Sequence, residues 1–257
     1  MRVFALSDLH ADYVENLDWI LQISKVDYQQ DILVLAGDVS DDLSVLSQVF
    51  SALRARFAEV LFVPGNHELW VQNDVVNCSL EKLELINMLC REEGIGQTLY
   101  NSASLSIVPL YSWYDFSFGE PDRHLRRAWR DFKACVWPSH LEHSADVNKH
   151  FLAMNEPLLN TRNTTVISFS HFLPRIDVMP SRIPHERRRV YPVLGSVGLG
   201  EQVMRLQPDI HIYGHSHVNQ SIELDNIRYV NNAFAYPKEE RIARKQLHCV
   251  LGEQDAA

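Results

Sequence analysis

Short apolar segments recur along this chain, and five of them run directly into side chains that can bind metal ions. Their aliphatic and β-branched residues are typical of buried strands, which we expect at Val3–Leu6, Ile32–Ala36, Val60–Val63, Val166–Phe169 and Ile210–Tyr213. The side chains that follow them are Asp8 and His10, Asp38, Asn66, His171, and His215 with His217. In open α/β sheets the functional crevice lies beyond the carboxyl ends of the strands. We therefore expect these side chains to converge.

Helical patterns alternate with the apolar segments over the first hundred residues. The spacing of leucine, valine and phenylalanine predicts one helix over Asp41–Phe57, capped by Ser40 or Asp41. A second is expected over Ser79–Glu93, with Ser79 as its cap and Gly94 as its stop. Such alternation of strands and helices favours an α/β layered fold.

Further strands are expected at Leu105–Leu110 and Ile227–Val230. The second of these would pair with Ser221–Leu224 in a hairpin, because the Asp225-Asn226 dipeptide between them is typical of a tight turn. A length of 257 residues with 46% hydrophobic residues suits one domain over 1–257. Residues 111–160 are less strand-like and rich in charges, so we expect a helical cap or insertion there.

The composition argues against several classes of function. No window approaches the roughly 18 uninterrupted apolar residues of a membrane span, and Asp8 comes too early for a signal peptide, so we expect a cytoplasmic protein. The net charge of −9 disfavours non-specific binding to nucleic acid or to an anionic membrane. The four cysteines show no CxxC spacing, which indicates neither a disulfide framework nor a thiolate zinc site.

Charge is unevenly distributed along the chain. Residues 1–120 contain 6 Lys and Arg against 18 Asp and Glu, whereas residues 121–190 contain 12 against 7. The basic residues of the middle segment include Arg123, Arg126, Arg127, Arg130 and Arg187 to Arg189. Arginine can bind phosphate with two parallel hydrogen bonds, but a solvated helix face has the same appearance.

Every polar group at the strand ends also has an ordinary structural explanation. Asp8 could cap a helix, Asp38 and Asn66 could form turns, and a lone His171 is more often structural than a ligand. Their joint placement favours a metal centre. Gly214 could let the backbone turn both rings of the His215 and His217 pair toward one point.

The donor types narrow the choice of metal. Carboxylate, amide oxygen and imidazole together suit Mn²⁺, Fe²⁺, Zn²⁺ or Ni²⁺ better than Mg²⁺ or Ca²⁺. Seven candidate ligands are too many for one ion but suffice for two ions about 3.5–4 Å apart, as in two-metal hydrolases. Asp38 is the natural bridging carboxylate, because it lies between the other groups in chain order.

The same residues form a known series of motifs. The series runs D-x-H (Asp8, His10), G-D (Gly37, Asp38), G-N-H-E (Gly65 to Glu68), His171 and G-H-x-H (Gly214 to His217). In this order and over most of the chain it resembles the calcineurin-like metallophosphoesterase superfamily. The resemblance implies a four-layer α/β/β/α sandwich, with two packed mixed sheets flanked by helices. It also implies one metal held by Asp8, His10, Asp38 and His217, and another held by Asp38, Asn66, His171 and His215.

The activity implied by this resemblance is hydrolysis of phosphoric esters. We expect a phosphodiesterase that uses a metal-bound hydroxide to attack phosphorus in line, acting on a small-molecule phosphate ester. His67 would stand beside the phosphate and donate a proton to the leaving oxygen. The alternatives are a phosphomonoesterase or protein phosphatase, and a non-catalytic protein-binding scaffold of the same fold, which the complete ligand set disfavours.

Three further features bear on substrate binding. Arg175, four residues after His171, is the arginine that we expect to contact phosphate, together with Asn66 and His67. The aromatic run Tyr111, Trp113, Tyr114 and Phe116 could stack a base or aryl group, although core packing is the commoner role of such a cluster. Glu68 could orient His67 or a ligand, or could interact with a helix N-terminus.

Overall fold

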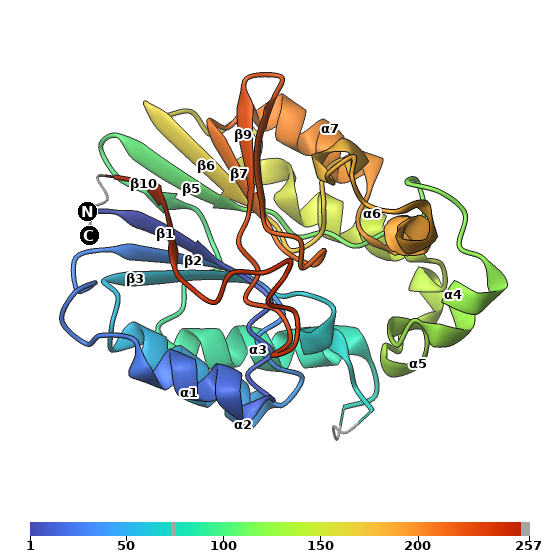
Figure 1. Cartoon of the computed structure of the whole chain (residues 1–257), viewed down its shortest axis with the longest axis horizontal. Coiled ribbons are helices and arrows are strands. Elements are labelled where there is room, and N and C mark those ends of the chain that lie inside the picture. Colours follow the sequence, from blue (N-terminus) through green and yellow to red (C-terminus); the bar gives the residue numbers. More distant parts are fainter. Residues whose placement is uncertain (73–75, 253–257) are drawn as a thin grey trace.

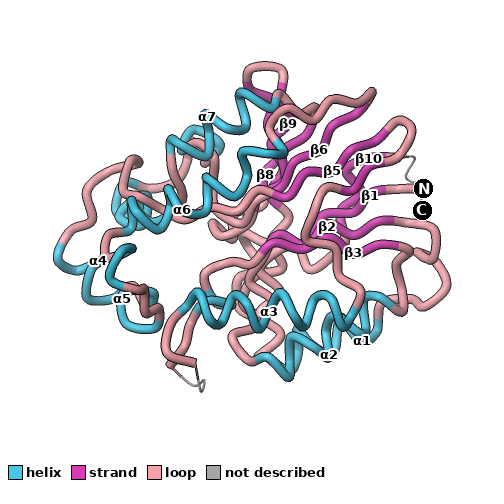
Figure 2. The backbone as a smooth tube through the Cα atoms, turned by 180° about the vertical axis from the view of Figure 1, so that it is seen from behind, coloured by secondary structure: helices cyan, strands magenta, loops and turns pink. Residues whose placement is uncertain are grey.

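Two β-sheets pack face to face in a computed structural model that describes residues 1–72 and 76–252. Helices cover the outer face of each sheet (Figures 1 and 2). The expected four-layer α/β/β/α sandwich is therefore present. In the described part of the chain, no helix has the length and apolar character needed to cross a membrane.

The first sheet has the strand order β10-β1-β2-β3. Its strands are β1 (Val3–Leu6), β2 (Ile32–Ala36), β3 (Glu59–Val63) and β10 (His248–Leu251). The first three are parallel and almost entirely buried, which explains their continuous apolar sequences. The last pairs antiparallel with β1 and was not expected from the sequence.

The second sheet has the order β4-β5-β6-β7-β9-β8. Its strands are β4 (Tyr100–Asn101), β5 (Leu105–Pro109), β6 (Thr165–Phe169), β7 (Ile210–Tyr213), β8 (Gln220–Leu224) and β9 (Ile227–Asn231). The predicted hairpin is present as β8 and β9, with Asp225 and Asn226 at φ angles of 51° and 62°. Two consecutive residues in this left-handed region are what a two-residue hairpin turn requires.

Seven α-helices and several 3₁₀ turns complete the described chain. The α-helices are α1 (Val14–Gln22), α2 (Leu43–Arg54), α3 (Ser79–Glu93), α4 (Arg123–Ala128), α5 (Asp131–Ala134), α6 (Ser144–Asn155) and α7 (Val197–Leu206). The 3₁₀ turns are η1 (His67–Leu69), η2 (Ser139–Leu141), η3 (Glu156–Leu158), η4 (Ile176–Val178) and η5 (His185–Val193). Helices α1, α2 and α3 lie along the first sheet, and α6 and α7 along the second (Figure 1).

Details of the helix ends differ from the expectation. Helix α2 is capped by Asp42, whose carboxylate accepts from the backbone N–H groups of Ser44 and Val45, and not by Ser40 or Asp41. Ser79 is the first residue of α3 rather than its cap, because its hydroxyl donates to the carbonyl oxygen of Leu69. Gly94 ends α3 at a φ of 70°, as predicted.

The buried cluster between the sheets is aliphatic except for Phe169, and the partly buried ring of Tyr100 packs against it. Val34, Val63, Ile107, Ile167 and Phe169 are all fully buried there. Truncating one such side chain to alanine typically costs about 2–5 kcal/mol, so this layer fixes the relative position of the sheets. Both sets of strand ends that carry the candidate ligands are held by it.

Residues 111–160 form a mainly helical excursion that contains α4, α5 and α6. The aromatic run at its start packs into an apolar cluster with Phe151 and Phe172. Trp113 and Tyr114 are each only 1% exposed, so these two rings are part of the hydrophobic core, as is common for such a cluster. They cannot stack on a substrate. Helix α4 ends at Ala128. Arg130 therefore does not lie on the same helix face as Arg123, Arg126 and Arg127.

Candidate metal centre and its cavity

Strand ends from both sheets supply the candidate ligands. Asp8 and His10 follow β1, Asp38 follows β2, Asn66 follows β3, His171 follows β6, and His215 and His217 follow β7. The predicted convergence occurs, because residues separated by up to 207 positions approach within hydrogen-bonding distance. All seven side chains are buried except that of His217, which is 12% exposed.

An unusual backbone accompanies this convergence. The φ angles are positive at Asp8 (52°), His10 (43°), Asp38 (56°), His215 (65°) and His217 (55°). A non-glycine residue in this left-handed region costs of order 1–3 kcal/mol of folding free energy, and such strained residues cluster at functional sites. The histidines therefore take the left-handed conformation themselves, and the expected role of Gly214 is wrong. A Cβ at Gly214 would lie 2.8 Å from the carbonyl oxygen of Ala36, so glycine is needed for close approach.

The first group of ligand atoms comes from Asp8, His10 and His217. The Nε2 atoms of the two histidines are 3.1 Å apart, and Nε2 of His217 is 3.3 Å from Oδ1 of Asp8. Nδ1 of His217 lies 2.7 Å from Glu239, which orients the ring as carboxylates behind metal-binding histidines do. Ser7 and the backbone N–H of His215 donate to the carboxylate of Asp8 and hold it in place.

The second group comes from Asp38, His171 and His215. Nε2 of His171 lies 3.0 Å from Nδ1 of His215, 3.1 Å from Oδ1 of Asn66 and 3.4 Å from Oδ2 of Asp38. The other nitrogens of these rings face the carbonyl oxygens of Ala36 and Val193, at 2.9 Å and 3.1 Å.

Those carbonyl contacts determine the tautomers. A carbonyl oxygen only accepts, so Nδ1 of His171 and Nε2 of His215 carry the hydrogens. Nε2 of His171 and Nδ1 of His215 then carry lone pairs, which point at each other. Oδ1 of Asn66 and Oδ2 of Asp38, which are also acceptors, lie beside them. No hydrogen bond joins two acceptors, whereas a cation satisfies all four atoms, and this donor set fits a divalent transition metal.

The pKa values agree with a site for positive charge. Burial lowers the pKa of His10, His171 and His215, which keeps them neutral and able to bind a metal. Burial also lowers the pKa of His217, but the carboxylates of Asp8 and Glu239 outweigh it and raise the pKa to about 9. Burial and the nearby carboxylates of Glu68 and Asp8 raise the pKa of Asp38, as expected for a buried anion that needs a cation.

His67 stands between the two groups. It forms a third potential ligand group with His10 and Asp38, and its Nε2 lies 3.8 Å from Oδ2 of Asp38. Its backbone N–H donates to Oδ1 of the same carboxylate at 3.0 Å. The ring packs on Trp70, with ring centroids 3.7 Å apart, so the imidazole has one supported face.

Glu68 ties two ligand loops together. Its fully buried carboxylate accepts from the backbone N–H groups of Asp38, Val39, Ser40 and Gly65 at 2.6–3.1 Å. Burial raises the pKa of Glu68 to about 7, although all four of these hydrogen bonds act to lower it. The observed hydrogen bonds connect Glu68 to the backbone around Asp38 and Gly65, which agrees with the expectation that it orients a candidate ligand.

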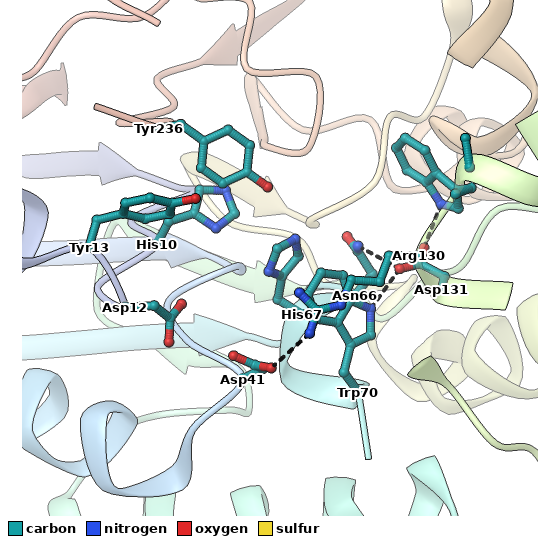
Figure 3. Close-up of a pocket in the computed structure, with 12 residues that line it drawn as sticks. His10, Asp12, Tyr13, Asp41, Asn66, His67, Trp70, Arg130, Asp131 and Tyr236 are labelled. Atoms are coloured by element: carbon teal, nitrogen blue, oxygen red, sulfur yellow. Dashed lines mark hydrogen bonds and ion pairs between the residues drawn. The ribbon is translucent and has the colours of Figure 1, made fainter. Parts of the chain in front are cut away.

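A cavity of about 410 Å³ opens beside this centre (Figure 3). Three residues of the candidate metal centre line it, namely His10, Asn66 and His67. Its other walls come from Asp12, Tyr13, Asp41, Trp70, Ala128, Trp129, Arg130, Asp131 and Tyr236. The guanidinium of Arg130 lies 4.2 Å from the ring centroid of Trp70 and 3.9 Å from Asp41.

The sequence reasoning missed most of these walls. Trp70 lies one turn after His67, and that spacing could have indicated it. Tyr236 and Asp131 carry no local signal, because each reaches the cavity through the tertiary fold. The same holds for Glu239, which hydrogen-bonds to His217.

Arg175 is not brought into this cavity. Its guanidinium is held by Asp177 at 2.6 Å and by Asp225, and it lines a separate hollow of about 650 Å³ beside α7. Two carboxylates already neutralise it, so the geometry does not favour the expected phosphate contact. Arg130 is the arginine that faces the candidate centre.

Comparisons with known proteins agree on one family. A family model described as calcineurin-like phosphoesterase matches residues 1–219. The acyl-carrier-protein phosphodiesterase PptH of Mycobacterium tuberculosis is 25% identical over 265 residues, covering 93% of this chain and 79% of the relative. The crystal structure of phosphopantetheinyl hydrolase (PptH) from the same organism superimposes with a TM-score of 0.80 at 22% identity, covering 100% of this chain and 98% of that one.

Proposed function

Since this chain belongs to the calcineurin-like phosphoesterase family and is a metal-dependent hydrolase of phosphoric esters, we propose that its substrate is a phosphodiester borne on a protein. The observation that carries the proposal is similarity over nearly the whole chain to a phosphodiesterase of acyl carrier protein. The product pair would be a phosphomonoester and a free hydroxyl on the carrier, with water adding to phosphorus.

Two divalent ions complete the proposed centre. Asp8, His10, Asp38 and His217 would hold one, and Asp38, Asn66, His171 and His215 the other, with Mn, Fe, Zn or Ni as the fitting metals. When bound, two such ions neutralise phosphate charge and make water a nucleophile near neutral pH. The convergence of lone pairs from His171, His215 and Asn66 supports the second set.

His67 and Arg130 are the proposed substrate contacts. His67 would hold a proton on Nε2 and pass it to the leaving oxygen. Burial lowers the pKa of His67, and the negative charge of a bound phosphate would raise it again. Arg130, supported by Trp70, would bind a non-bridging oxygen or a second phosphate, in place of the role expected for Arg175. Asn66 would face both a metal and the phosphate.

The charge pattern supports a protein-borne substrate over a free small molecule. Arg126 and Arg127 lie on α4, immediately before the residues Ala128, Trp129 and Arg130 that line the cavity. Both side chains are exposed. Because PptH is a phosphopantetheinyl hydrolase, a phosphopantetheinyl group is the part of the substrate that we propose enters the cavity.

One assay panel tests this function. The purified chain is loaded with Mn²⁺, Ni²⁺ or Mg²⁺ and offered a phosphopantetheinylated carrier protein, a bis-aryl phosphate, a mono-aryl phosphate and cyclic nucleotides. We expect mass spectrometry to show loss of the phosphopantetheinyl group from the carrier, and faster turnover of the diester than of the monoester. Faster monoester turnover would instead identify a phosphatase, and no turnover with metal bound would identify a scaffold.

A further inference from the structure

Asp131 is a buried carboxylate that reaches the site from the helical excursion. It lies in α5 and is 3% exposed. Its Oδ1 accepts from Nδ2 of Asn66 at 2.9 Å and from Nε1 of Trp70 at 2.7 Å (Figure 3). Its Oδ2 accepts from Nε1 of Trp129 at 2.7 Å. These three donors are neutral N–H groups, and the neutral hydroxyl of Tyr114 also hydrogen-bonds to this carboxylate. Burying a carboxylate without a cationic partner is costly, so packing alone does not explain this residue.

The hydrogen bond to Asn66 sets the orientation of an amide. A carboxylate only accepts, so it selects the rotamer in which Nδ2 faces Asp131. The carbonyl oxygen of Asn66 must then face the opposite way, where it lies 3.1 Å from Nε2 of His171 in the second ligand group. In the flipped rotamer two oxygens would meet at Asp131 and a nitrogen donor would face the metal position.

The two tryptophans that donate to Asp131 also pack against histidine rings of the centre. Trp70 packs its ring against His67, at a centroid distance of 3.7 Å. Trp129 meets the ring of His215 edge to face, at 5.8 Å and an interplanar angle of 82°. One carboxylate therefore contacts a candidate ligand directly and two rings that each touch another residue of the centre.

We propose that Asp131 is a positioning residue that aims the carbonyl oxygen of Asn66 at the metal centre and fixes the aromatic wall behind His67. The excursion thereby completes the centre, which the strand ends alone leave without a defined orientation for Asn66. This inference rests on the ligand role of Asn66 in the proposed function.

The first test is Asp131→Asn, with metal stoichiometry as the readout. Protein dialysed against buffered free Mn²⁺ or Zn²⁺ is analysed by elemental analysis, and the affinity is measured by calorimetry. We expect one of two ions to bind about 10–100-fold more weakly, as is typical when a partner of a metal ligand is removed. Asp122→Asn makes the same chemical change at the exposed cap of α4 and should leave both ions bound.

A swap variant separates orientation from loss of charge. In the Asn66→Asp, Asp131→Asn double variant, the amide at position 131 can donate to the carboxylate at position 66, and the total charge is that of the parent. Because Oδ1 of Asp131 also accepts from Trp70, the two single variants and the double variant are compared in a Trp70→Phe background, where no indole N–H meets the new amide. We expect the double variant to bind more metal than either single variant, because Asn66→Asp alone sets two carboxylates against each other. Additive losses in this cycle would overturn the proposal.

The remaining outcomes are also decisive. If Asp131→Asn does not fold, the folded swap variant decides the matter by its metal content: two ions support the proposal and one or none overturns it. Parent affinity for both ions in a folded Asp131→Asn variant overturns it as well. If the parent chain itself binds no metal, it is the proposed function that fails, so the two failures are distinguishable.

Discussion

The catalytic role proposed for His67 depends on the surroundings of its side chain. The ring is 13% exposed, is fixed on one face by Trp70, and has Nε2 3.8 Å from a shared carboxylate oxygen of Asp38. This position lets the ring reach the cavity without belonging to the four-atom ligand sets. Its contribution should therefore be separable from metal binding.

We expect His67→Ala to reduce turnover of a diester with a poor leaving group by about 10²–10⁴-fold, which is the usual contribution of a general acid. The metal content, measured by elemental analysis, should stay at the parent value. His124, an exposed histidine on α4, provides the matched control, and His124→Ala should behave as the parent. Full activity in the His67 variant would remove this residue from the mechanism.

Gly65 is a second single-residue test, because a Cβ there would lie 2.2 Å from Oδ1 of Asp38. We expect Gly65→Ala to displace this shared carboxylate and to lower the binding of both ions. Gly94→Ala, at a φ of 70° with no neighbour nearer than 3.5 Å, should cost about 1–2 kcal/mol of stability and retain both ions. Equal metal content in the two variants would contradict the steric argument.

Among the elements, the parallel strands and the hairpin could be predicted from sequence because their signals are local. Val34 and its neighbours are apolar on both faces, and Asp225-Asn226 fits a two-residue turn. The convergence of the candidate ligands could be predicted because each follows such a strand. Helix α1, strand β10 and the backing residue Glu239 could not, since their places depend on contacts between distant segments.

An ion pair joins the beginnings of two neighbouring strands. The side chain of Arg2 donates to Asp31 at 2.7 Å and 3.0 Å, and the carboxylate is 6% exposed. Burial raises the pKa of Asp31, but the hydrogen bonds from Arg2 outweigh it and hold the pKa below its usual value. A depressed carboxylate pKa stabilises the folded chain above the unfolded pKa of about 4, and this stabilisation is lost as pH falls through the folded value.

We expect Arg2→Ala to lower the free energy of unfolding at pH 7 by about 1–3 kcal/mol, as for a hydrogen bond to a charged group. The difference in the free energy of unfolding between variant and parent, measured by urea unfolding, should decrease below about pH 4. Arg205→Ala breaks an exposed pair with Glu156 and should cost at most about 1 kcal/mol. A difference that is independent of pH would show that the ion pair is not its source.

For the whole molecule, charge separation is the feature with a functional consequence. The chain carries a net charge of −9, yet residues 121–190, which include α4, carry 12 basic against 7 acidic residues. Under the proposed function, a carrier protein that delivers a tethered ester to the cavity would bring its surface close to α4. Attraction between charged surfaces accelerates association and weakens as salt is added.

We expect kcat/KM for an acidic carrier-borne diester to fall steeply between low and physiological salt. The Arg126→Ala, Arg127→Ala double variant should flatten this salt dependence and lower kcat/KM at low salt by about tenfold. The loss should be confined to the protein substrate, with hydrolysis of a bis-aryl phosphate serving as the control. Equal losses on both substrates would place these arginines in the chemistry rather than in docking.

The pairing of β1 with β10 brings the start of the described chain beside its end, with Val3 opposite Leu251. Figures 1 and 2 both place this pair at the pole away from α4 and α5. An affinity handle, a fluorophore or a surface tether attached at this pole would therefore leave the cavity mouth open. Kinetics recorded on immobilised protein should then report the same enzyme as kinetics recorded in free solution.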